Sequence, residues 1–66
     1  MQMSSHAYDQ AVSRNISEED INHAITHGSR WRCNRDPAIH YARLNGTFVV
    51  MHGRGLWVLT AYHLED

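Results

Sequence analysis

Apolar residues recur with helical spacing near the start of the chain. A short side chain able to cap a helix, Ser4 or Ser5, precedes them. The spacing places these apolar residues on one face and predicts an amphipathic helix over residues 5–14. The stripe comprises Ala7, Tyr8, Ala11 and Val12.

The segment ISEEDI has the pattern of a helix N-terminus. Ser17 is the expected N-cap, and Asp20 at the third helical position nearly completes a capping box. Ile16 and Ile21 have the spacing of a hydrophobic staple, and Gly28 is a natural stop. A second helix is therefore expected over residues 18–27, with a buried face of Ile21, Ala24 and Ile25.

The second half of the chain has the pattern of β-strands. Asn45-Gly46 separates two runs rich in β-branched and aromatic residues, which is the signal of a two-residue hairpin. Asp36-Pro37 ends a shorter run before them, and "GRG" turns the chain into the last one. The expected strands are "RWRC", "AIHYARL", "TFVVMH" and "LWVLTAYH".

Strand pairing then assigns the residues to two faces. The hairpin sets Leu44 opposite Thr47, and a tight second turn would set Val50 opposite Trp57. The bulkier, more aromatic face is expected against the helices: Ile39, Tyr41, Phe48, Val50, Trp57, Leu59 and Ala61. The other face is expected to point outward: His40, Ala42, Leu44, Thr47, Val49, Met51, Leu56, Val58, Thr60 and Tyr62. A one-residue slip at "GRG" would reverse the last strand.

The small size of the chain limits it to one domain, residues 1–66, of the α+β class. The predicted fold is two N-terminal helices packed on one face of a three- or four-stranded antiparallel sheet. A chain of this length is marginally stable alone, so a homodimer or a partner protein is expected. The exposed apolar residues Val49, Met51 and Val58 are the expected partner-binding surface.

Location is predicted from what the sequence lacks. It has no membrane-spanning stretch and no secretory signal, and the single Cys33 cannot form an intrachain disulfide. We therefore expect a bacterial cytoplasmic protein.

The chain has arginine but no lysine, and five of its six arginines lie from residue 30 onward. Arginine suits bidentate phosphate contacts, so a surface that binds RNA is one interpretation. The other is that charged strand edges prevent unwanted strand pairing. The candidate RNA-binding residues are Arg30, Arg32, Arg43 and Arg54.

Histidine and cysteine do not build a convincing metal site. His23 and His27 have the spacing of a helical ligand pair, with Glu19 one turn earlier, but a zinc site needs three or four ligands and a supporting shell. We therefore predict no metal and no other cofactor. Cys33, flanked by Arg32 and Arg35, could have a lowered pKa.

Three short marks resemble a known family: a His opening the first helix, an Arg before the Ile-Ser cap, and a terminal Thr-x-Tyr. Here these are His6, Arg14, Thr60 and Tyr62. The chain from about residue 5 to 62 resembles a small bacterial family of uncharacterised domains grouped with the RelE/ParE-like toxins. The wider fold of barnase, EndoU, colicin and RelE is commonly that of metal-independent ribonucleases. The family pattern often has Gly where this chain has Asn15.

The resemblance implies a catalytic set. His6 would be the general acid or base, Arg14 would stabilise charge on the phosphoryl centre, and Thr60 and Tyr62 would orient the phosphate. Each has an ordinary alternative. His6 would be a surface residue, Arg14 would pair with Asp9 or cap the carbonyls of its helix, and the two hydroxyl residues would be strand formers.

Two functions follow from these observations. The first is a toxin-type ribonuclease that cleaves RNA by transesterification, or a degenerate relative, with an antitoxin-like protein as partner. The second is a non-enzymatic interaction module that dimerises or binds a partner through the outer sheet face.

Overall fold

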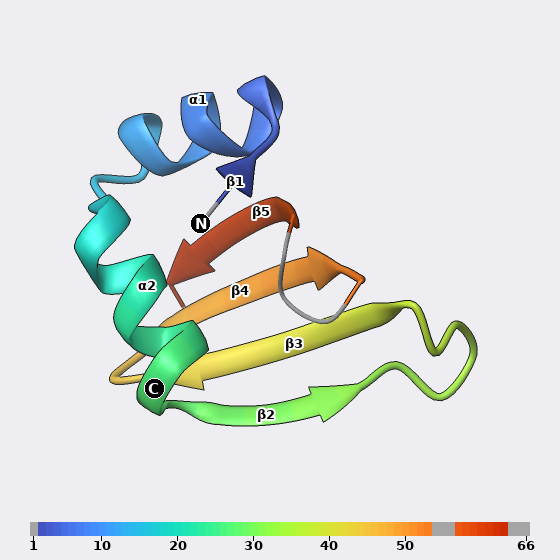
Figure 1. Ribbon diagram of the computed structural model, residues 1–66. Coiled ribbons are helices and arrows are strands. Elements are labelled where there is room, and N and C mark those ends of the chain that lie inside the picture. Colours follow the sequence, from blue (N-terminus) through green and yellow to red (C-terminus); the bar gives the residue numbers. More distant parts are fainter. Residues whose placement is uncertain (1, 54–56, 64–66) are drawn as a thin grey trace.

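Two helices lie on one face of a five-stranded sheet in the computed structural model, which describes residues 2–53 and 57–63 (Figure 1). The elements in chain order are β1 (Gln2–Met3), α1 (Ser5–Ser13), α2 (Glu18–His27), β2 (Ser29–Arg32), β3 (Ile39–Leu44), β4 (Thr47–His52) and β5 (Trp57–His63). The predicted α+β class and the two N-terminal helices are confirmed. None of the helices in these ranges is long and apolar enough to cross a membrane.

Both helices begin at the caps that the sequence predicts. The Ser4 hydroxyl accepts a hydrogen bond from the amide of Ala7 at 3.0 Å, and the Ser17 hydroxyl accepts one from Asp20 at 3.0 Å. α2 has the predicted bounds, whereas α1 ends one residue earlier than predicted, with Arg14 as its C-cap. Asn15 follows at φ 59°, a left-handed conformation that asparagine tolerates and that glycine adopts freely.

The sheet is mixed, with strand order β1-β5-β4-β3-β2. β1 pairs in parallel with β5, and the other neighbours are antiparallel. The prediction of three or four antiparallel strands is therefore wrong at one edge. Two residues are too few to show an alternating pattern, so β1 was not detectable from the sequence.

The Asn45-Gly46 hairpin is confirmed. Both residues have positive φ, 51° and 84°, and Leu44 lies opposite Thr47 as predicted. The predicted pairing of Val50 with Trp57 is wrong, because Trp57 lies opposite His52. A bulge then interrupts β5, so that Val50 lies opposite Thr60. The "GRG" turn falls largely on residues outside the described ranges.

The assignment of the two sheet faces is inverted for β3, β4 and the beginning of β5, whereas Ala61 lies in the core as predicted. Val49, Met51 and Val58, predicted to point outward, are 0% exposed and pack beneath the helices. They are therefore not available as a partner-binding surface. The helices contribute mainly alanine to this core, so they approach the sheet closely and small or unbranched strand residues fill the layer. The buried alanines are Ala7, Ala11 and Ala24 from the helices and Ala42 and Ala61 from the strands.

The prediction for the last strand differs from the structure in two ways: the face of Trp57 is wrong, and the bulge was not predicted. Trp57, predicted to point into the core, is 42% exposed. The bulge moves the next residues by one position and so exchanges their faces. Tyr62 consequently lies opposite Phe48 on the face away from the helices, which is where it was predicted to lie, although the predicted register was wrong.

Candidate nucleic-acid interface

Four aromatic rings cross the sheet on its outer face, the face opposite the helices. We call Trp31, Tyr41, Phe48 and Tyr62 the aromatic ladder; they come from β2, β3, β4 and β5. Successive ring centroids are 5.5, 5.5 and 5.0 Å apart along this series. Trp31 is 43% exposed and the other three rings are partly exposed. Such contacts stabilise the sheet, and the four rings form a contiguous, partly exposed aromatic surface.

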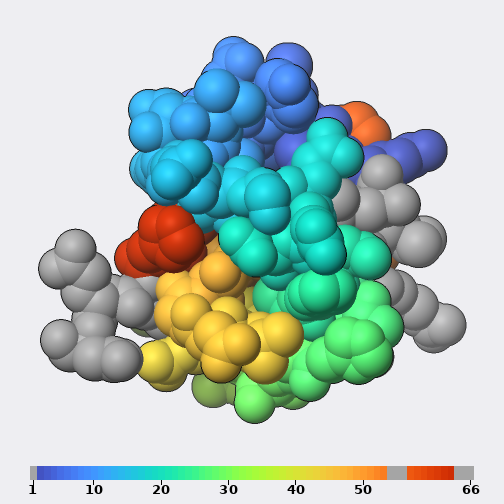
Figure 2. All heavy atoms as spheres, turned by 90° about the vertical axis from the view of Figure 1, so that its left-hand side faces the viewer, coloured from blue at the N-terminus to red at the C-terminus, as the bar shows by residue number. Residues whose placement is uncertain are grey.

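One end of the ladder meets helix α1. The guanidinium of Arg14 lies over the Tyr62 ring, 5.8 Å from its centroid, and its Nη1 donates a 2.8 Å hydrogen bond to the carbonyl of Ala61. This bond across the molecule is neither of the two ordinary alternatives considered for Arg14. Figure 2 looks toward this region, where the red end of β5 lies directly below the blue α1.

A second contact joins the same two elements. The hydroxyl of Thr60 donates to Oε1 of Gln10, one helical turn before Arg14. We call Gln10, Arg14, Thr60, Ala61 and Tyr62 the α1–β5 corner. Three of the four predicted catalytic residues therefore converge there.

His6 does not lie in the corner. It lies on the same stripe of α1 as Gln10 and Arg14, since the three are spaced by four residues. Eight residues separate it from Arg14, which corresponds to about 12 Å along a helix axis. His6 is exposed, near the opposite end of the helix. The structure thus separates the predicted proton-transfer residue from the predicted cation.

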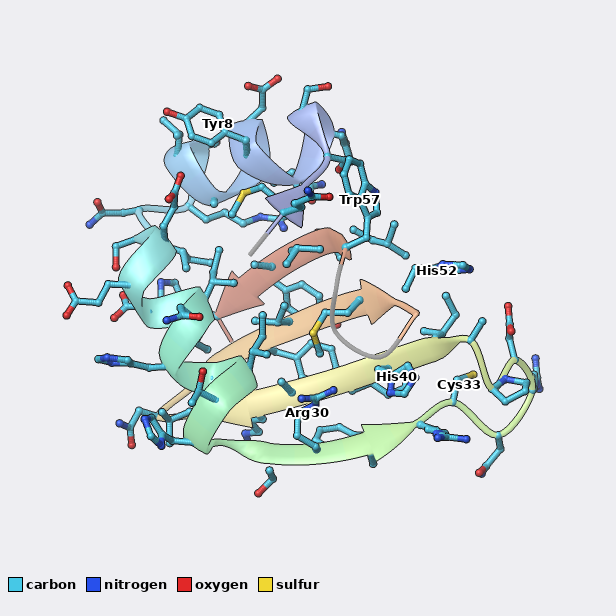
Figure 3. The ribbon with its side chains drawn as sticks, in the orientation of Figure 1. Tyr8, Arg30, Cys33, His40, His52 and Trp57 are labelled. Carbon is cyan, nitrogen blue, oxygen red and sulfur yellow. The ribbon has the colours of Figure 1, made fainter. Side chains whose placement is uncertain are left out.

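The predicted RNA-binding arginines are divided between the two sides of the sheet. Arg43 lies opposite Phe48, on the outer face, and is exposed. Arg30 reaches from β2 toward α2, where its Nη1 donates to the carbonyl of Ile25 at 3.2 Å (Figure 3). Arg32 lies opposite the buried His40 and therefore on the helix side of the edge strand. Arg54 lies outside the described residues.

Charge is segregated between the two layers. Strands β2 to β5 contain no aspartate or glutamate. In the described part of the chain the acidic residues lie on the helices or in the loop before β3: Asp9, Glu18, Glu19, Asp20 and Asp36. The sheet is thus the more favourable side for a polyanion.

Cys33 lies beside the ladder, where β2 ends (Figure 3). The pKa of its thiol is lowered, chiefly because the backbone N–H of Asp36 donates to it, and further by the N–H of Arg35 and the hydroxyl of Tyr41. The pKa of Tyr41 is raised because its hydroxyl donates to Cys33, with a smaller contribution from burial. The lowered pKa proposed from the sequence is confirmed, but backbone donors produce it.

The remaining histidines lie elsewhere. The rings of His23 and His27 are 6.0 Å apart on α2, and the described residues contain no group of three or more histidine, cysteine or carboxylate side chains that could hold a metal. A pocket of about 190 Å³ lies between α2 and the ends of the strands. Its lining, which the sequence did not reveal, is Asp20, His23, Leu44, Asn45, Thr47 and His63.

Comparison with known proteins adds no assignment: no family model, curated protein or solved structure matches this chain. The resemblance to the RelE/ParE-like family therefore remains an expectation based on its short motifs.

The aromatic ladder as an uncovered surface was missed by sequence reasoning. The pattern did place Tyr41 and Phe48 on one face, but size and hydrophobicity assigned that face to the core. Little in the sequence argues against that choice, because the predicted apolar helix faces carry tyrosine, valine and isoleucine as well as three alanines. Only the structure shows that alanine predominates among the helix residues that are buried, which lets the helices pack closely against the sheet.

Proposed function

We propose that this protein is an RNA-binding domain that holds a backbone phosphate at the α1–β5 corner. The observation that supports the proposal most directly is the convergence of Arg14 and Tyr62, residues far apart in sequence, at one exposed edge of the sheet. Only one of the five N–H donors of the guanidinium is needed for the bond to Ala61. The others suit a phosphate, which arginine binds with matching geometry.

The charge distribution favours the same ligand. A phosphate at this corner would lie at the edge of strands that carry no carboxylate, with Arg43 on the same face. Binding through phosphates releases counterions and so weakens steeply with salt.

Salt dependence tests this proposal. Fluorescence anisotropy of labelled RNA oligonucleotides would be followed for wild type, Arg14→Ala and Arg35→Ala, which removes an equal charge from an exposed loop position. We expect Arg14→Ala to weaken binding for all sequences and to reduce the salt slope by about 0.7 to 1, the contribution of one phosphate contact. Equal effects of the two variants, or no RNA binding by the wild type, would contradict the proposal.

Cleavage at the bound phosphate is the second candidate. The RNA 2′-oxygen would form a bond to phosphorus as the bond to the 5′-oxygen breaks, leaving a 2′,3′-cyclic phosphate and a 5′-hydroxyl. One group must accept the 2′ proton and another must protonate the leaving oxygen, while a cation stabilises the phosphorane. Arg14 supplies the cation and Tyr62 a hydroxyl, whereas His6 is two helical turns away from Arg14.

Incubation of RNA with the protein in the presence of a chelator separates binding from cleavage. Fragments ending in cyclic phosphate, lost in Tyr62→Phe or His6→Ala, would establish catalysis. If the RNA stays intact across a range of pH while binding is retained, the protein binds RNA without cleaving it.

A further inference from the structure

We propose that the aromatic ladder is a stacking platform for the bases of single-stranded RNA, continuing from the phosphate at the corner. This inference rests on the proposed function. Tyr62 connects the two sites, because its ring centroid lies 5.8 Å from the guanidinium of Arg14 and 5.0 Å from the ring centroid of Phe48. A strand with its phosphate at Arg14 could thus place successive bases over the rings of β5, β4, β3 and β2.

The rings of the aromatic ladder are partly exposed. Both helices pack on the opposite face, and the ladder residues retain exposed surface. Neighbouring rings in the series from Trp31 to Tyr62 are inclined to one another by 32° to 39° and form a continuous row across the four strands. Sheets with exposed aromatic residues commonly stack two or three bases, and stacking tolerates any base because every base has a π-face.

Charge favours a nucleic acid over a protein partner or a second copy of the chain. Arg14 lies at one end of the ladder, Arg43 lies beside Phe48, and strands β2 to β5 carry no carboxylate. Two copies meeting through this face would bring like charges together, which is unfavourable. A polyanion would instead meet arginines at the edge and rings in the middle, the combination found in proteins that bind single strands.

A stacking platform selects unpaired bases. In a duplex the base faces are covered by their neighbours, so a platform of this kind cannot reach them. Binding should therefore be stronger for a single strand than for a duplex of the same length. Stacking alone does not distinguish ribose from deoxyribose, so a DNA oligonucleotide reports how much any 2′-hydroxyl contact contributes.

The first experiment measures anisotropy with labelled decauridine, decathymidine and a ten-base-pair RNA duplex. Tyr41→Leu and Phe48→Leu remove a ring but keep an apolar side chain. Tyr8→Leu is the matched control, because Tyr8 is 50% exposed and projects from α1 away from the sheet (Figure 3). Each ladder variant should weaken decauridine binding at least about fivefold, the low end for one stacked base, with little change in Tyr8→Leu.

A second measurement avoids substitutions within the ladder. Trp57→Phe leaves Trp31 as the sole tryptophan, since the chain has two. Stacking on the indole should quench its fluorescence as decauridine is added, with the same midpoint as the anisotropy titration. An indole signal that stays constant while RNA binds would overturn the inference.

The outcomes separate this inference from the proposed function. If Arg14→Ala weakens binding while the ladder variants and Tyr8→Leu bind like wild type, the corner holds RNA and the platform is wrong. Equal affinity for duplex and single strand overturns the platform as well. Sedimentation showing a dimer that Trp31→Ala dissociates would assign the ladder to a second copy, and absence of any RNA binding would remove both proposals.

Discussion

Arg14 holds the end of α1 against the last strand. β1 covers the edge of β5 only at Trp57 and Val58, so the carbonyl of Ala61 has no strand partner on that side. The guanidinium supplies the missing donor, and Gln10 contacts Thr60 beside it. A side chain proposed to bind phosphate thus also satisfies a backbone group of the sheet.

Replacing Arg14 should cost stability as well as RNA affinity. Hydrogen bonds to charged donors contribute about 1.5–3 kcal/mol, and exposure of this residue reduces that, so we expect Arg14→Ala to lose about 1 kcal/mol in urea unfolding. Arg14→Lys keeps a charge that can reach the carbonyl and should lose less. Equal losses in the two variants would show that the bond to Ala61 contributes little.

The Cys33 thiol should react at lower pH than an ordinary cysteine. Its lowered pKa means that the thiolate, which is the nucleophile, forms earlier as pH rises. The pH midpoint of iodoacetamide alkylation should therefore lie below that of a cysteine in the urea-unfolded chain. Tyr41→Phe removes one donor and should move the midpoint upward without restoring the unfolded value, because the backbone donors remain.

The sequence identifies which residues carry reactive or charged groups, but it does not reveal which other residues those groups contact. The family resemblance implies contacts with a phosphate for Arg14 and Tyr62, and these roles stay predictions. The bond from Arg14 to Ala61 depends on how α1 lies along β5. No periodicity in the sequence specifies that placement. The lowered pKa of Cys33 likewise depends on backbone amides of the loop, whose directions a sequence does not reveal.

Close packing between elements explains why position 28, between α2 and β2, is occupied by glycine. A Cβ at this position would lie 2.4 Å from the carbonyl oxygen of Arg43 and 2.5 Å from that of Ala24. The backbone is extended there, at φ −79°, so the requirement is for space and not for a left-handed conformation. The sequence correctly predicted where α2 stops, but the reason is contact with β3.

A pair of glycine substitutions tests this explanation. Gly28→Ala forces backbone atoms apart, and overpacking of this kind costs about 1–3 kcal/mol. Gly53→Ala meets no atom within 4 Å, but its φ of 68° is unfavourable for alanine, so we expect about 1 kcal/mol. Thermal unfolding should rank Gly28→Ala as the less stable variant, and the reverse order would contradict the packing argument.

Helices and strands were predicted well where a cap or a turn requires particular residue types. Ser17 and the Asn45-Gly46 pair fixed α2 and the central hairpin. The bulge in β5 and the two-residue β1 have no such signal, because both are consequences of pairing between distant segments.

At the scale of the whole molecule, the two faces of the sheet differ in side-chain size as well as in polarity. Alanines and aliphatic residues fill the layer between helices and sheet, and the aromatic residues cross the other face. Hydrophobicity alone suggested the reverse arrangement, since large rings bury the most area. The buried residues of the helices are mostly alanine, so the interface between helices and sheet is lined by smaller side chains than the sequence suggested.

Adjacent positions on β4 should respond in opposite ways to the same change. Met51→Asp places a carboxylate in a fully buried position, so we expect loss of the folded circular-dichroism spectrum at 25 °C. Val50→Asp, on the outer face and partly exposed, should keep the fold with a lower melting temperature. A folded Met51→Asp variant would contradict the assignment of faces.

The most direct measurement is a two-dimensional ¹H–¹⁵N NMR titration of the protein with decauridine. The amides of Tyr41, Phe48 and Tyr62 and the indole N–H of Trp31 should shift progressively and together, while α2 residues 18–27 stay unchanged. Shifts confined to the helices, or a spectrum unaltered by saturating RNA, would contradict the assignment of the outer sheet face as the RNA-binding surface.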